Sequence, residues 1–138
     1  MEKEHELIKE LKNYKYEVQY FLEKSKDIDK LKNEIEKSYA RLIQMKEKNI
    51  DTKDIHKQLN KIIEKQSKEE NALLNILTKK QKIERQIENL PQPFKNVIFF
   101  RYICGYSFDT IASKMNYSTK RIYQLHNEGL QIYIKMYG

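Results

Sequence analysis

The sequence predicts an all-α protein in which a long N-terminal helical hairpin is followed by a small helical bundle. The 138 residues include only 3 glycines and 2 prolines, so turns are few and elements are long. Charged residues make up 34% of the chain, yet the apolar residues recur at helical spacing, which indicates amphipathic helices rather than disorder. The chain changes character at Leu90-Pro91, after which aromatic residues become dense and charge falls.

The first expected helix carries a seam of apolar or small residues whose spacing alternates between four and three, which is typical of a coiled coil. The seam consists of Leu7, Leu11, Tyr14, Val18, Phe21, Ser25 and Ile28, and it continues with some drift through Leu31, Ile35, Tyr39 and Leu42. The pattern stops near residues 49–52. We expect Asp51 to cap the next helix and Asp54 to lie in its first turn, where a carboxylate is favourable.

A second seam follows, and every one of its steps is again four or three residues. Its members are Ile55, Leu59, Ile62, Gln66, Glu69, Leu73, Ile76, Lys80, Ile83, Ile87 and Leu90. Two such helices joined by a short turn make a coiled-coil-like hairpin, which we assign to residues 1–89. The polar members Gln66, Glu69 and Lys80 are expected to cost stability and to fix register or orientation.

Further apolar residues widen the hairpin's apolar stripe beyond one narrow seam. They are Ile8, Leu22, Ile43, Ile63, Leu74 and Leu77. A stripe this wide is unfavourable in water, so we expect the hairpin to pack against a second copy or another partner. A homodimer formed through the N-terminal helices is the preferred interpretation, and a hetero-partner stays open.

Residues 90–138 are expected to form the bundle. A helix over 93–103 would turn Phe94, Val97, Ile98 and Tyr102 toward the core. Ser107 is expected to cap a short helix whose inward residues are Phe108, Ile111, Ala112 and Met115. Asn116 occupies a turn that needs a left-handed residue, Tyr117 is expected to pack inward, and Ser118 to cap a second helix with Ile122 and Leu125 buried. This pattern fits a helix-turn-helix bundle.

The outward side of that second helix carries the candidate DNA-binding residues. They are Ser118, Thr119, Lys120, Arg121, Tyr123, Gln124 and Asn127. An Arg121 guanidinium can contact guanine through two hydrogen bonds, and a Gln124 or Asn127 amide can contact adenine in the same way. Lys120 and Thr119 can reach phosphate or base. The alternative is an ordinary amphipathic helix pair with a polar face, but the joint fit of turn, caps and buried positions favours DNA binding.

The charge distribution agrees with phosphate contact. Residues 1–90 carry 21 basic against 18 acidic side chains, whereas residues 91–138 carry 6 against 2. The C-terminal third therefore has a modest positive field in a region that is otherwise poor in charge.

A family resemblance supports the same interpretation. Leu90-Pro91, then 101–107 (RYICGYS), then Ile111-Ala112 resemble region 4 of the sigma-70 family of RNA polymerase sigma factors, over about residues 80–134. The resemblance implies a helical domain that reads promoter DNA with its second helix-turn-helix helix, at residues 118–127 here. Nothing in residues 1–80 looks like the promoter-melting region of a full sigma factor. A long Lys/Glu-rich helical N-terminus before such a domain resembles phage late-gene transcriptional regulators of the ArpU and RinA type.

Other chemistry finds little support in the sequence. The three histidines share no ligand spacing with the single cysteine, so we expect neither a metal site nor a cofactor. We interpret Cys104 as a small buried residue rather than a nucleophile, and His126 as a polar surface or backbone-contacting residue rather than a ligand. With no signal peptide or membrane-spanning stretch recognised, a cytoplasmic, non-enzymatic protein is expected.

The expected partners are double-stranded DNA, a second copy of the chain and RNA polymerase. Two other functions stay open. One is a phage small terminase subunit, which combines similar modules for DNA packaging but in the opposite order. The other is an adaptor that docks on RNA polymerase without reading DNA.

Overall fold

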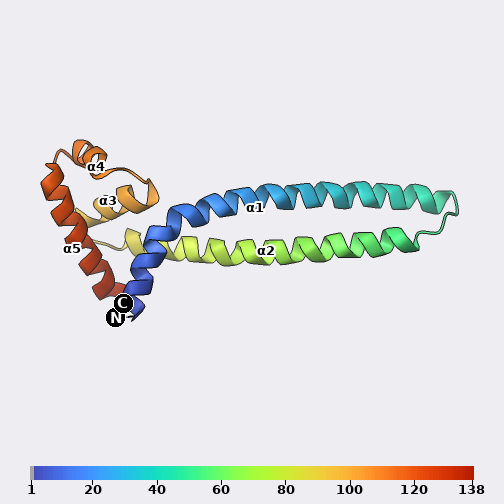
Figure 1. Cartoon of the computed structure of the whole chain (residues 1–138), viewed down its shortest axis with the longest axis horizontal. Helices are drawn as coiled ribbons and strands as arrows, with labels where there is room; N and C mark the ends of the chain where they lie inside the picture. Colours follow the sequence, from blue (N-terminus) through green and yellow to red (C-terminus); the bar gives the residue numbers. More distant parts are fainter. Residues whose placement is uncertain (1) are drawn as a thin grey trace. The chain divides into compact units, whose positions relative to one another are not determined.

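The computed structural model describes residues 2–138, and every regular element within that range is helical. The elements are α1 (Glu2–Glu47), α2 (Lys53–Glu88), α3 (Phe94–Ile98), a π-helical turn η1 (Phe99–Ile103), α4 (Phe108–Met115) and α5 (Thr119–Tyr137) (Figure 1). The first two helices are long and pack against each other, and the others are shorter. The predicted all-α class, a long hairpin followed by a small bundle, is confirmed.

The chain forms two compact units, and each contains part of the hairpin. The hairpin unit is Gln19–Leu77. The terminal unit comprises the chain up to Val18 together with Thr78–Gly138. The division into functional regions at residues 89 and 90 stays a prediction, and the compact units divide the chain elsewhere because the start of α1 packs with the C-terminal elements.

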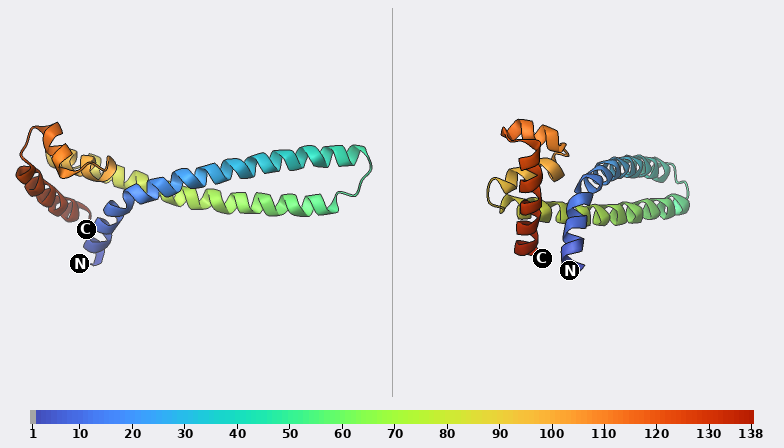
Figure 2. Two further views of the ribbon diagram at one scale, coloured as in Figure 1. Left: turned by 45° about the horizontal axis from the view of Figure 1, so that its top comes forward. Right: turned by 60° about the vertical axis from the view of Figure 1, so that its left-hand side comes forward.

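In the hairpin unit, α1 and α2 run side by side in opposite directions (Figures 1 and 2). The seam positions Ile28, Leu31, Leu42, Ile55 and Leu59 are buried, as the apolar spacing predicts. Tyr39 departs from that pattern, because it lies where the four-three spacing drifts and its side chain is 47% exposed.

The reversal between α1 and α2 follows local backbone chemistry. Asn49 has a φ of 55°, the left-handed conformation that asparagine tolerates well. The Asp51 carboxylate accepts the backbone N–H of Lys53 at 3.0 Å, so it satisfies one of the free donors at the start of α2. Asp51 therefore satisfies a donor of the first turn, as expected, but from one residue before the N-cap position, which Thr52 occupies because its carbonyl accepts the His56 N–H.

Each polar residue of the second seam has a partner. Glu69 forms an ion pair with Lys24 at 3.2 Å, and this pairing raises the pKa of Lys24. Gln66 donates to Glu70 at 3.1 Å. In the terminal unit, Lys80 donates to Glu84 at 2.7 Å. These groups are partly solvated, so each pair contributes little to stability, and their expected effect on register stays a prediction.

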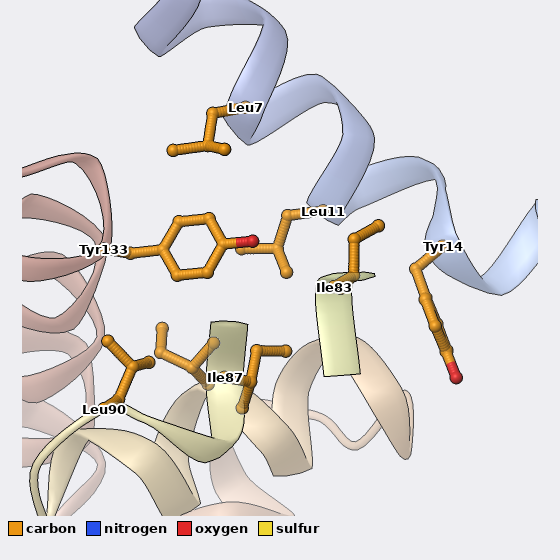
Figure 3. Packing of buried hydrophobic residues seen from close by; sticks show 8 residues of the cluster. Leu7, Leu11, Tyr14, Ile83, Ile87, Leu90 and Tyr133 are labelled. Carbon is orange, nitrogen blue, oxygen red and sulfur yellow. The ribbon is translucent and has the colours of Figure 1, made fainter. Parts of the chain in front are cut away.

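The core of the terminal unit joins both ends of the chain. Its buried members are Leu7, Leu11, Tyr14, Ile83, Ile87, Leu90, Ile98 and Tyr133 (Figure 3). The Tyr133 hydroxyl donates to Gln86 Oε1 at 2.6 Å, and the Tyr137 hydroxyl donates to the Gln86 carbonyl at 2.9 Å. Burial raises the pKa of Tyr133, so the ring stays neutral. The second half of α5 is thereby fixed against α1 and α2.

A second cluster packs α3, α4 and α5 together through Val97, Ile111, Ala112, Ile122 and Leu125. Gly129 lies where α5 meets α3. A Cβ added there would lie 3.1 Å from Ile98 Cγ1, so glycine permits this close approach.

The helix expected over 93–103 is present as α3 followed directly by η1. Val97 and Ile98 are fully buried, and Phe94 and Tyr102 are half-buried, as expected. The hydrogen-bond ladder widens after Ile98, so the Cys104 N–H reaches the Phe99 carbonyl at 3.2 Å, five residues back. The Gln92–Pro93 peptide bond before α3 is cis.

A substitution at Leu11 tests whether the start of α1 is packed in the core of the terminal unit. Its side chain is fully buried, so Leu11→Ala should lower the free energy of unfolding by about 2–5 kcal/mol. Urea denaturation followed by circular dichroism measures this loss.

Ile50→Ala, in the turn that follows the same helix, is the matched control. Ile50 is 49% exposed and is not among the residues proposed for association, so the truncation should cost less than about 1 kcal/mol. Equal losses in the two variants would show that Leu11 is not packed in a core.

Candidate nucleic-acid interface

Helix α4 begins at a conventional serine cap. Ser107 has extended backbone angles, and its hydroxyl accepts the Thr110 N–H at 3.1 Å. Ile111 and Ala112 are buried, whereas Phe108 and Met115 are half-buried. The predicted cap and inward face of this helix are confirmed.

The turn between α4 and α5 has the conformation that the sequence predicts. Asn116 lies in the left-handed region, with φ 57° and ψ 39°. The Tyr117 N–H donates to the Ala112 carbonyl at 3.0 Å and closes the end of α4. The Ser118 hydroxyl then accepts the Arg121 N–H at 3.1 Å and caps α5.

The expectation that Tyr117 packs inward is wrong, because its side chain is 42% exposed. Its backbone is held by the hydrogen bond that ends α4, and the core between the helices is already filled. The side chains that fill it are Ile111, Ala112, Ile122 and Leu125, each 5% exposed or less.

The structure gathers the candidate residues on the exposed side of the first turns of α5. Lys120, Arg121, Gln124 and Asn127 are all exposed. Arg121 Nη1 donates to Gln124 Oε1 at 3.3 Å, so these two side chains lie together one turn apart. Positive and amide groups therefore share one helix face, as predicted.

The other three candidates also have structural roles. Ser118 is exposed, but its hydroxyl caps the helix. Thr119 is half-buried, and its hydroxyl donates to Asp109 Oδ1 at 3.0 Å, which ties α5 to α4. Tyr123 is 49% exposed while its ring centroid lies 4.3 Å from that of Phe108.

Beside this face, five residues outside the candidate set form a connected group. The Arg101 guanidinium lies 4.3 Å from the centre of the Phe108 ring and donates to the Tyr106 carbonyl at 3.0 Å. His126 Nε2 lies 2.7 Å from the Tyr102 hydroxyl, and the two rings stack with centroids 5.6 Å apart.

The environment of His126 favours its neutral form. Burial lowers the pKa of His126, and the charges of Arg101 and Lys12 lower it further. A hydrogen bond between His126 Nδ1 and Asn127 Oδ1, 3.3 Å apart, opposes these effects without reversing them. The interpretation of His126 as a polar surface or backbone-contacting residue is therefore wrong, since the ring is half-buried and its hydrogen bonds join the side chains of Tyr102 and Asn127.

These groups border an open hollow of about 460 Å³, which we call the basic hollow. Its lining residues are Lys12, Lys15, Tyr16, Arg101, Tyr102, Gly105, Phe108 and His126. Sequence reasoning missed this feature because its lysines belong to α1, far from the C-terminal region in the sequence. One signal was present: neither Lys12 nor Lys15 has an acidic residue three or four positions away.

The interpretation of Cys104 as a buried residue is wrong, because this side chain is exposed at the end of η1. Across residues 2–138, no group of three or more His, Cys, Asp or Glu side chains is arranged to hold a metal ion. Within the same residues, no helix combines the length and the apolar character that a membrane span requires.

Comparisons with known protein families, with curated proteins and with solved structures found no match.

Substitutions at Asn116 test the left-handed conformation of the turn between α4 and α5. A β-branched residue is strained in the left-handed region, so Asn116→Val should lower the free energy of unfolding by at least about 1–2 kcal/mol. Thermal denaturation of the full chain measures the effect. Asn116→Gly is the control, because glycine adopts this conformation without a steric penalty. Equal melting temperatures for the valine and glycine variants would contradict the assigned conformation.

Proposed function

We propose that the protein is a sequence-specific DNA-binding transcriptional regulator that reads duplex DNA with the first half of α5. The observation that carries this proposal is the division of α5 into two sides. Ile122 and Leu125 are buried, whereas Lys120, Arg121 and Gln124 project from an exposed, serine-capped helix start. A recognition helix needs this combination, because it must pack rigidly while offering donors and acceptors to base edges.

The electrostatics of the region support phosphate contact. Residues 91–138 carry 6 basic and 2 acidic side chains. One of the two acids, Asp109, accepts the Thr119 hydroxyl at 3.0 Å. The positive end of the α5 dipole adds to the attraction for an anionic backbone.

In this proposal, the α4–α5 pair is a helix-turn-helix of the sigma-70 region 4 type, and the protein acts near promoters as phage late-gene regulators do. The capped α4, the left-handed Asn116 and the capped α5 support this class. RNA polymerase is a second proposed partner, because the sigma-type domains that the sequence resembles contact both DNA and polymerase.

We further propose that the hairpin unit joins two copies into a dimer. Leu22, Ile43 and Leu74 are 57%, 59% and 58% exposed. Large apolar side chains exposed on one hairpin favour association. A dimer would place two α5 helices on two half-sites, which adds affinity and specificity without new base contacts.

Selection from genomic fragments at near-physiological salt tests the reading function. The wild type should enrich one or a few sites, and a variant carrying Lys120→Ala, Arg121→Ala and Gln124→Ala should not. Equal enrichment by both proteins, or none by the wild type, would reject base reading by α5 and direct attention to polymerase binding.

On the selected duplex, Arg121→Ala should cost about 1–3 kcal/mol of binding free energy if the guanidinium contacts a base. The loss should be concentrated on the selected sequence. An equal loss on random duplex would identify Arg121 as a phosphate contact instead.

The oligomeric state tests the role of the hairpin. Light scattering should give twice the 16.8 kDa mass of one chain, and a Leu22→Gln, Leu74→Gln variant should shift the mass toward one chain. A concentration-independent monomer would remove the dimer, and a mass of eight or more chains would favour a ring of the small-terminase kind.

A further inference from the structure

The basic hollow of the terminal unit has the chemistry of an anion site. Its lining includes three cationic side chains, Lys12, Lys15 and Arg101, and no carboxylate. Burial and the neighbouring charges hold the pKa of His126 below its ordinary value, so its ring adds no charge, and both of its nitrogens are engaged by Tyr102 and Asn127. The remaining lining is aromatic or glycine.

The cations of the hollow are not neutralised by carboxylates of the described chain. Among residues 2–138, neither Lys12, Lys15 nor Arg101 lies within 4.0 Å of an acidic group. Other lysines of the hairpin, such as Lys24 and Lys80, do form such pairs. A concentration of unpaired positive charge in a concave surface attracts anions more strongly than isolated surface charges do.

The backbone holds these cations close to one another. Lys12 and Lys15 are three residues apart on α1 and therefore share one helix face. Lys15 reaches across Gly105, because a Cβ on that glycine would lie 3.9 Å from Lys15 Nζ. Gly105 has a φ of 72°, which favours glycine at this position. The Arg101 guanidinium is oriented by the Phe108 ring and the Tyr106 carbonyl.

The hollow borders the face of α5 that carries the candidate base-reading residues. The Phe108 ring contacts both Tyr123 of that face and Arg101 of the hollow. His126, in the lining, is hydrogen-bonded to Asn127 of the candidate set. A ligand that covers the exposed side of α5 therefore extends toward the hollow.

We propose that the basic hollow binds a phosphodiester of duplex DNA, on the strand that flanks the groove occupied by α5. This inference rests on the proposed function and extends its DNA interface to α1. In helix-turn-helix complexes, groups beside the recognition helix contact the phosphates and fix the register, while the recognition helix reads the bases. Lys12 and Lys15 supply positive charge that attracts the DNA phosphate, and Arg101 supplies an oriented hydrogen-bond donor to it.

The salt dependence of binding tests this site. Affinities for the selected duplex and a random duplex are measured by fluorescence anisotropy over a range of salt concentrations. Each lost phosphate contact should reduce the slope of log affinity against log salt by about 0.9. The Lys12→Gln, Lys15→Gln variant should lose about one to two units of slope on both duplexes and keep the ratio of specific to random affinity.

Lys3→Gln, Lys82→Gln is the matched control, since it removes the same charge from exposed positions on α1 and α2 that do not line the hollow. Its slope should stay within a few tenths of the wild-type value. An equal slope change in the two double variants would overturn the site, because the effect would then reflect net charge alone.

The outcome is separable from that of the proposed function. If the wild type binds duplexes without selecting a sequence, base reading by α5 fails, yet a slope change confined to Lys12→Gln, Lys15→Gln still supports the hollow. If the wild type selects a site and this variant keeps the full slope, only the hollow is overturned.

Titration of the ¹⁵N-labelled protein with inorganic phosphate at constant ionic strength, read at the Gly105 amide, adds a third arm. Saturation far below the millimolar range, together with an unchanged duplex slope, would identify a free-phosphate site and overturn the DNA assignment.

Discussion

Tyr133 is fully buried, and its hydroxyl donates to Gln86 Oε1 at 2.6 Å, so the polar atom of this core residue is satisfied by α2. That contact also constrains how the rest of α5 is rotated. Ile122, Leu125, Gly129 and Tyr133 are all buried and follow one another at steps of three, four and four along α5. Because they share one side of a single helix, burial of Tyr133 also sets the rotation of the first turns of α5. The opposite side, with its Lys, Arg and amide groups, is exposed as a consequence.

The same core explains why α1 contributes to the proposed interface. Leu7, Leu11 and Tyr14 are buried in the cluster that contains Tyr133. The Tyr14 hydroxyl donates to Glu84 at 2.5 Å, and Lys80 donates to the same carboxylate. Burial works against the charged form of Glu84, but these two donors hold the pKa of Glu84 below its ordinary value.

Because α1 is helical, the packing of its apolar residues also determines where its neighbouring lysines lie. Lys12 and Lys15 directly follow Leu11 and Tyr14, so packing of the apolar positions fixes where the lysines emerge. Two lysines that look like ordinary solvated surface residues in the sequence thereby line the basic hollow. The start of α1 therefore has two roles, since it begins the hairpin and also forms one wall of that hollow.

Much of this architecture could be predicted from local rules. The four-three spacing predicted both arms of the hairpin, and the roles of Ser107, Asn116 and Ser118 followed from capping and left-handed turn preferences that act over a few residues. The exposed polar face of α5 followed from the same periodicity, because buried Ile122 and Leu125 leave the opposite side of α5 to solvent. Local rules work here because each outcome is decided within about one helical turn.

The misjudged features depend on tertiary packing. The exposure of Tyr117 and Cys104 depends on which neighbouring side chains already fill the core. The basic hollow needs residues about ninety positions apart, Lys12 and Arg101 among them, and no sequence period connects them. A pattern along the chain can show that a lysine lacks an acidic neighbour, but not which surface it will face.

The hydrogen bonds of His126 assign different tasks to the amides of α5. The side-chain oxygen of Asn127 can only accept, so the neutral ring donates to it from Nδ1, and Nε2 accepts from the Tyr102 hydroxyl. Asn127 is thereby oriented by the lining of the hollow, and part of its accepting capacity is already used. Among residues 2–138, the Gln124 side chain is hydrogen-bonded only by Arg121, an exposed partner that can itself reach a base. In the proposed complex, Arg121 and Gln124 therefore read the bases, while Asn127 couples their helix face to the phosphate contact beside it.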